Sequence, residues 1–65
     1  MIKLCKYNVT VVKEDEYMFK VEMNFLREDL GWKWIPTTEY YTKRAQIEKK
    51  LAHLREKGYE VLKES

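Results

Sequence analysis

Hydrophobic and polar residues alternate along the first part of the chain in two blocks separated by an acidic turn. The first block covers residues 5–11 and the second residues 17–25, and four polar residues, 13–16, lie between them. Because successive side chains of a strand point to opposite faces, a period of two indicates a strand with one buried and one solvated face. The polar residues between the blocks are typical of a hairpin loop. We therefore predict an antiparallel hairpin over residues 5–25.

A third β-prone segment, residues 32–41, follows a polar connection that ends at Gly31. It is rich in aromatic and threonine side chains, which favour strands. Pro36 interrupts it, and proline has no backbone N–H to donate to a neighbouring strand. Proline is therefore confined to edge strands and kinks. The segment predicts either one edge strand or two short pieces joined at Pro36.

The hydrophobic period changes after residue 41 to that of a helix. One helical stripe contains Ile47, Leu51 and Leu54. Gly58 follows at the position of a C-terminal cap, and residues 59–63 then predict a short final strand. Thr42 is suited to cap the start of the helix, whereas a start at Thr38 would extend the stripe back to Tyr40. Both starts remain open.

These segments predict a single α+β domain over residues 1–65 with the order β-β-β-α-β. We expect a small antiparallel sheet, made of a three-stranded N-terminal meander and a short C-terminal strand, with one helix packed on one face. A chain of 65 residues has room for one core only. One helix covers one face of a sheet, so the other face is expected to be exposed and mostly polar. Its predicted side chains are Lys6, Asn8, Thr10, Met18, Lys20, Glu22 and Asn24, with Val12 and Leu26 at the margins.

The residue types that support catalysis and metal binding are scarce. Cys5 is the only cysteine and His53 the only histidine, so the chain has neither an internal disulfide nor the ligands of a zinc cage. Cys5 alternates into the apolar face, and His53 lies off the apolar stripe of the helix. We therefore expect no catalytic residue, cofactor or metal site, and no enzyme activity. No apolar stretch is long enough to span a membrane, which favours a cytoplasmic protein of a cell or an infected host.

Charge is unevenly distributed along the chain. The formal net charge is only +2, but residues 43–57 contain six basic and two acidic side chains, a net charge of +4. Basic side chains on one helix can contact the phosphates of a nucleic acid. The alternative is an ordinary solvated helix face. The candidate nucleic-acid-binding residues are Lys33, Lys43, Arg44, Lys49, Lys50 and Lys57.

Aromatic residues cluster in the third predicted strand, next to lysines. Such side chains stack on bases or anchor protein interfaces, and they also form hydrophobic cores. The candidate protein-binding residues are Trp32, Trp34, Tyr40 and Tyr41.

Two functions follow from these patterns. The first is a small nucleic-acid-binding module that uses the basic helix and an aromatic and lysine-bearing sheet surface. Three strands followed by a helix that is entered through Tyr41-Thr42-Lys43 resemble the amino-terminal, arm-site-binding domains of phage-type integrases, over roughly residues 5–57 and in element order. That resemblance implies DNA binding, but the strand predicted after Gly58 departs from it, and no site residue is carried over.

The second function is a protein-binding regulator or inhibitor, of the kind that phages and mobile elements encode, or a homodimer. An edge strand and exposed tryptophans would then form the contact surface. The residue pattern leaves both functions open.

Overall fold

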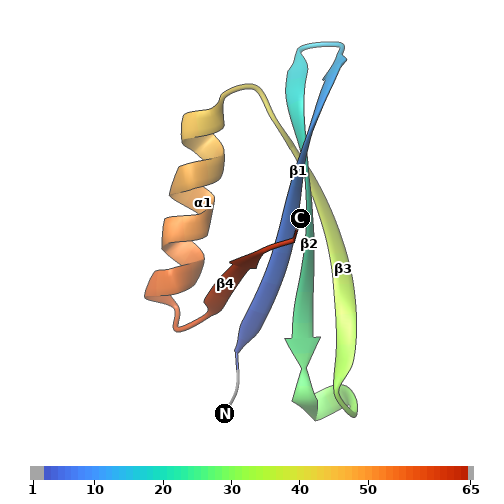
Figure 1. The fold of residues 1–65 in the computed structure, drawn as a ribbon, viewed down its shortest axis with the longest axis vertical. Helices are drawn as coiled ribbons and strands as arrows, with labels where there is room; N and C mark the ends of the chain where they lie inside the picture. The colour runs from blue at the N-terminus through green and yellow to red at the C-terminus, as the bar shows by residue number, and fades with distance from the viewer. Residues whose placement is uncertain (1–2, 65) are drawn as a thin grey trace.

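The computed structural model describes residues 3–64, which form a four-stranded sheet with one helix packed against one of its faces (Figure 1). The predicted order β-β-β-α-β is confirmed. The strands lie in the order β3-β2-β1-β4. The elements are β1 (Leu4–Glu14), β2 (Tyr17–Arg27), the 3-10 turn η1 (Glu28–Leu30), β3 (Lys33–Tyr41), α1 (Arg44–Glu56) and β4 (Glu60–Lys63).

The first three strands form the predicted antiparallel meander. Cys5 pairs with Phe25, and Val21 pairs with Val9 on one side and with Glu39 on the other, so the apolar sets of β1 and β2 share one face. The hairpin turn is shorter than the predicted loop, because the strands continue to Glu14 and resume at Tyr17. A register shift between Val11 and Glu14 marks a bulge, in which Val12 and Lys13 of β1 lie opposite the single residue Met18 of β2.

The fourth strand differs from the prediction in its direction. β4 pairs in parallel with β1, Leu4 opposite Glu60 and Tyr7 opposite Lys63, so the sheet is mixed and only β1–β3 are antiparallel. The cause is the path of the chain. α1 returns the chain to the end of the sheet at which β3 began, so the strand that follows must run in the direction of β3, which is also that of β1.

The helix begins one residue later than predicted, because its N-cap is Lys43 and not Thr42. Arg44 is its first residue and Lys43 its N-cap, whereas Thr38 belongs to β3, so the earlier of the two predicted starts is wrong. The side-chain oxygen of Gln46 accepts hydrogen bonds from the backbone N–H groups of Thr42 and Lys43, both at 3.1 Å. A glutamine at the third helical position thus satisfies these N–H groups, as in a capping box.

Pro36 is accommodated without a break in β3. The strand runs continuously from Lys33 to Tyr41 and has β2 as its only neighbour within the described residues, so it is the edge strand that the sequence predicted. Proline fits an edge strand when its nitrogen points away from the sheet. The proline therefore also reduces the number of N–H donors on the free edge of β3.

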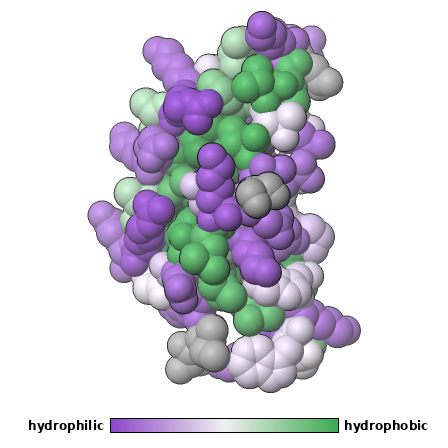
Figure 2. Space-filling model, in the orientation of Figure 1, coloured by the Kyte–Doolittle hydropathy of each residue, from purple (hydrophilic) through white to green (hydrophobic). Residues whose placement is uncertain are grey.

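The core lies between α1 and the apolar face of the sheet. Its buried side chains are Cys5, Val21, Met23, Ile47, Leu51 and Leu54, and the three helical ones are those of the predicted stripe. Tyr7, Val9, Phe19, Phe25, Tyr41, Tyr59 and Val61 pack around them and are partly buried. Figure 2 shows hydrophobic side chains that reach the surface between polar ones, as expected where a short helix covers a longer sheet.

Candidate functional site

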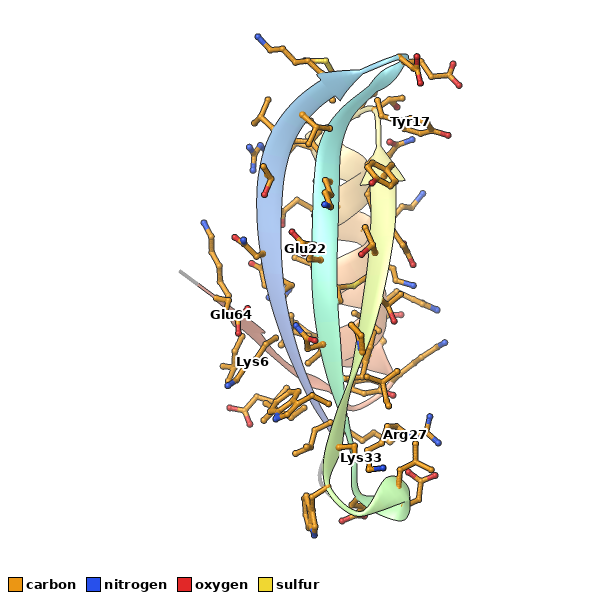
Figure 3. All side chains as sticks on the ribbon, turned by 90° about the vertical axis from the view of Figure 1, so that its right-hand side faces the viewer. Lys6, Tyr17, Glu22, Arg27, Lys33 and Glu64 are labelled. Atoms are coloured by element: carbon orange, nitrogen blue, oxygen red, sulfur yellow. The ribbon has the colours of Figure 1, made fainter. Side chains whose placement is uncertain are left out.

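The sheet face opposite α1 is uncovered, and it consists of the alternate residues that the sequence assigned to it (Figure 3). The centre of this face is polar, with Glu22 of β2 between Asn8 of β1 and Thr38 of β3. The end near η1 is apolar, where Leu26 pairs with Trp34. The uncovered face is therefore divided into a polar centre and an apolar end.

Trp34 is 40% exposed at the apolar end of this face. The ammonium group of Lys6 lies 4.8 Å from the centroid of the Trp34 ring, within the range of a cation–π contact. Lys6 also pairs with Leu62 of β4, which is 41% exposed. The aliphatic stem of Lys6 thus links two exposed apolar side chains across the sheet. We refer to Leu26, Trp32, Trp34 and Leu62 as the tryptophan patch.

Trp32 is more exposed than Trp34, at 56%, and its backbone is unusual. Its φ angle is +59°, directly after Gly31 at +81°, so both residues are in the left-handed region. Glycine adopts this conformation freely, but a residue with a Cβ atom loses about 1–2 kcal/mol there. Backbone strain of this kind concentrates at functional sites. The strained turn holds the indole of Trp32 at the end of the sheet, in contact with solvent.

Trp32 forms part of an open cleft of about 510 Å³ at this end of the molecule. Its other lining residues are Lys3, Leu26, Arg27, Glu28, Asp29 and Tyr59. Arg27 donates two hydrogen bonds to the carboxylate of Asp29, at 2.9 and 2.7 Å, and these bonds lower the pKa of Asp29. The ammonium of Lys3 donates to the backbone carbonyl of Lys57 at 3.1 Å. Arg27 and Asp29 thus balance each other's charge at the rim, and the cleft between Leu26, Trp32 and Tyr59 offers apolar and aromatic surface.

The two candidate tyrosines point to opposite faces of β3. Tyr40 is 45% exposed on the uncovered face, and its ring centroid lies 5.8 Å from that of Tyr17. Tyr41 faces the helix, where its hydroxyl donates to Glu39. Burial and this hydrogen bond raise the pKa of Tyr41 to about 12. The four aromatic candidates therefore do not form one cluster: Trp32 and Trp34 share one end, Tyr40 lies at the other, and Tyr41 belongs to the core side.

The basic side chains of the helix are distributed around its axis. Lys50 and Lys57, seven residues or about two turns apart, lie on the flank that faces β3, whereas Lys43 is the N-cap at the other end of the helix. The ammonium of Lys50 lies 3.6 Å from the carboxylate of Glu39, which fixes the direction of this flank. The guanidinium of Arg44 lies 5.0 Å from the centroid of the Phe19 ring, on the sheet side of the first turn.

Lys33 and Lys49 are separated from that flank. Successive residues of a helix are rotated by about 100°, which places Lys49 on the side of α1 that points away from the sheet. Lys33 is at the start of β3, opposite Arg27, whereas Lys43 follows the end of the same strand (Figure 3). The candidate nucleic-acid-binding residues are therefore spread over both ends of the molecule and two sides of the helix.

Cys5 and His53 lie in contrasting environments. Cys5 is fully buried, and burial raises the pKa of its thiol, which lowers the fraction present as the reactive thiolate. His53 is exposed on α1, with its ring nitrogen 3.9 Å from the carboxylate of Glu56. Within residues 3–64, no three side chains of the metal-binding types lie close enough together to hold an ion. In the same residues, no helix combines the length and the apolar composition needed to cross a membrane.

A second hollow, which the sequence did not predict, lies on the helix side of the sheet. It measures about 340 Å³, and we refer to it as the basic groove. The groove is lined by Phe25, Arg27, Ile35, Thr37, Leu54, Lys57 and Tyr59. The groove forms because of the angle at which α1 crosses the strands, and neither the alternation of the strands nor the helical period predicts that angle.

The comparisons with known proteins give no relative: no protein-family model, curated protein or solved structure matches the chain.

Proposed function

We propose that the domain is a non-catalytic protein-binding module and that the tryptophan patch is its contact surface. The observation that carries this proposal is the exposure of both tryptophans, 56% for Trp32 and 40% for Trp34, at one end of a very small domain. A tryptophan stabilises a fold in proportion to the surface that it buries, so the exposed parts of these two side chains add nothing to the stability of the isolated domain. Tryptophan is also the residue type most enriched at the energetic centre of protein interfaces.

The surroundings of the patch support a protein partner. Leu30 at the end of η1, two residues before Trp32, adds a further exposed apolar side chain near the patch. Lys6 and Asn24 border it on the uncovered face, which gives the apolar centre and polar rim of a protein interface. The uncovered face and its β4 margin carry two lysines and three glutamates, which disfavours the phosphates of a nucleic acid there. These charged residues are Lys6, Lys20, Glu22, Glu60 and Glu64.

The test is a comparison of wild-type chain with Trp32→Ala and Trp34→Ala, using Lys49→Ala as the control on the far side of the helix. Proteins cross-linked to each variant in cell extract are identified, and a recovered partner is then titrated in purified form. A second copy of the chain is detected by light scattering. We expect each tryptophan substitution to weaken the complex about 30-fold or more, which corresponds to about 2 kcal/mol. Unchanged affinity in both folded variants would refute the proposal.

A nucleic-acid-binding module is the second candidate, and one observation favours it. Among residues 43–57, Lys50 is the only lysine or arginine that forms an ion pair with another described residue, so most of the basic charge is available. Elution from mixed-sequence DNA resin in steps from about 50 to 500 mM salt tests this candidate. Retention that salt releases, and that reversing the charges of Lys43, Arg44, Lys49 and Lys50 abolishes, would support it. Flow-through at the lowest salt would refute it.

A further inference from the structure

We propose that the basic groove binds a segment of a partner protein in which an acidic side chain adjoins a large apolar one. The proposal rests on the protein-binding function above, and it names the chemistry of the partner at a second surface, on the opposite side of the sheet from the tryptophan patch. Arg27 and Tyr59 border both the groove and the cleft at Trp32, so one partner can reach both.

The groove arises because the helix is shorter than the sheet and crosses it obliquely. The 13 residues of α1 extend about 20 Å, whereas the 11 residues of β2 extend about 36 Å. α1 starts beside the end of β3, and its chain continues into β4 at the opposite edge of the sheet (Figure 1). The first half of β3, with Ile35 and Thr37, is therefore left partly uncovered. The ion pair between Glu39 and Lys50 joins strand and helix beyond this point.

The floor of the groove is apolar and supported by the core. Leu54 is 5% exposed and belongs to the core cluster, and Phe25 packs against it. The Phe25 and Tyr59 rings meet edge to face, with centroids 5.5 Å apart. Ile35 of β3 completes the floor. A volume of about 340 Å³ is at the lower limit of ligand pockets and matches one or two side chains of a peptide.

The charge at the groove selects an anion. Lys57 and Arg27 line it, Lys33 adjoins Arg27 in the sheet, and no acidic side chain is among the lining residues. Arg27 uses Nε and Nη2 for Asp29, which leaves Nη1 available. The nearest acid along β3, Glu39, already contacts Lys50 and Tyr41.

The C-terminal end of α1 carries about half a negative charge, which disfavours an anion in the groove. Its last carbonyl groups accept hydrogen bonds from the backbone N–H groups of Lys57, Gly58 and Tyr59, which reduces this effect. The charge of Lys57, which forms no ion pair with another described residue, outweighs it, and Arg27, whose own charge is balanced by Asp29, adds a free Nη1 donor. An anion alone would leave the apolar floor exposed to water, so a peptide that carries both a carboxylate and an apolar side chain is the complementary occupant.

A displayed library of random peptides about ten residues long provides the probe, because the partner's sequence is unknown. The library is selected on the wild-type chain at about 150 mM salt, and the enriched peptides are synthesised with a fluorescent label. Their affinities are measured by anisotropy on wild type, Lys57→Glu, Lys49→Glu and Trp34→Ala. Lys49→Glu makes the same change of charge on the side of α1 that faces away from the sheet. Circular dichroism shows that each variant is folded, and Lys57→Gln replaces Lys57→Glu if the latter is not.

We expect enrichment of Asp or Glu next to Leu, Ile or Phe. Binding should fall about tenfold in Lys57→Glu and stay within about twofold in Lys49→Glu and Trp34→Ala. Peptides that bind through the tryptophan patch would instead lose affinity in Trp34→Ala, which would overturn the groove while supporting the proposed function. Enrichment of neutral or basic peptides, equal losses in the two lysine variants, or displacement of the peptide by an oligonucleotide would each refute the groove proposal.

Discussion

Leu51 and Leu62 provide a matched test of where the core lies. Both are leucines, but Leu51 is 2% exposed between α1 and the sheet, whereas Leu62 is 41% exposed on the uncovered face. Alanine removes three carbon atoms from each, worth about 2.4 kcal/mol of transfer energy when they are fully buried. At Leu51 the resulting cavity adds to this loss, so we expect about 3 to 4 kcal/mol. At Leu62 the loss should be about 1 kcal/mol, because solvent fills the space.

These losses are large for a domain of this size. At about 0.05–0.15 kcal/mol per residue, the free energy of unfolding of 65 residues is about 3–10 kcal/mol. Leu51→Ala should therefore lower Tm by about 12 °C or more, or unfold the domain, while Leu62→Ala lowers it by about 4–8 °C. Urea unfolding followed by far-UV circular dichroism measures both. If Leu51→Ala is unfolded in buffer, Leu51→Met, which keeps the side-chain volume, should remain folded and lose less than about 1.5 kcal/mol. Equal losses at the two positions would show that the helix does not pack as described.

Three further predictions concern the titrating groups, the turn after α1 and the ion pair between β3 and α1. Burial raises the pKa of Cys5, and burial with the Glu39 hydrogen bond raises that of Tyr41 to about 12, so the unfolded chain loses these protons first as the pH rises. The contribution of these groups to the free energy of unfolding should therefore be constant below about pH 9 and fall between about pH 9 and pH 12. The urea midpoint measured as a function of pH tests this. If Tyr41→Phe showed the same fall of the midpoint above about pH 10 as the wild-type chain, the prediction would be wrong. Gly58 has a φ of +94°, and a Cβ atom there would meet only the Lys3 side chain, at 3.9 Å. Gly58→Ala should still lower the free energy of unfolding by about 1–2 kcal/mol, because a residue with a Cβ atom is strained at this φ angle. An unchanged Tm in thermal unfolding would argue against the left-handed turn. The Glu39–Lys50 pair is about one-third exposed, so Lys50→Met should change stability by less than about 1 kcal/mol in a urea titration, and a larger loss would mean that the pair is more buried than described.

The residue pattern predicts most of the fold because its signals are local. Alternation places Cys5 and Phe25 on one face, and these residues are paired across β1 and β2. The helical period identifies the three helix residues that are buried in the core. Pro36 correctly indicates an edge strand, because the missing N–H group restricts its place in any sheet.

The features that the pattern does not predict depend on the three-dimensional path of the chain. The parallel direction of β4 follows from the helix returning across the sheet, and the start of α1 at Arg44 depends on hydrogen bonds to Gln46. The lysines of residues 43–57 are close in sequence but lie on different sides of the helix, and Lys50 is directed toward Glu39. For the tryptophans, the period does not say which face of the sheet they occupy, and the exposure of Trp32 depends on a left-handed turn that few residues other than glycine adopt.

The position of β1 inside the sheet has a consequence for synthesis of the protein on the ribosome. β1 is made first and pairs with β2 soon afterwards, but its other edge is completed only by β4, which begins at Glu60. At about 5–20 residues per second, the chain between Glu14 and Glu60 takes several seconds to make. During this time the nascent meander carries an unpaired edge and an apolar face without its helix, both of which attract other chains. Translation speed or chaperone contact over residues 15–59 should therefore influence the yield of folded protein more than in a domain whose central strands pair as they emerge.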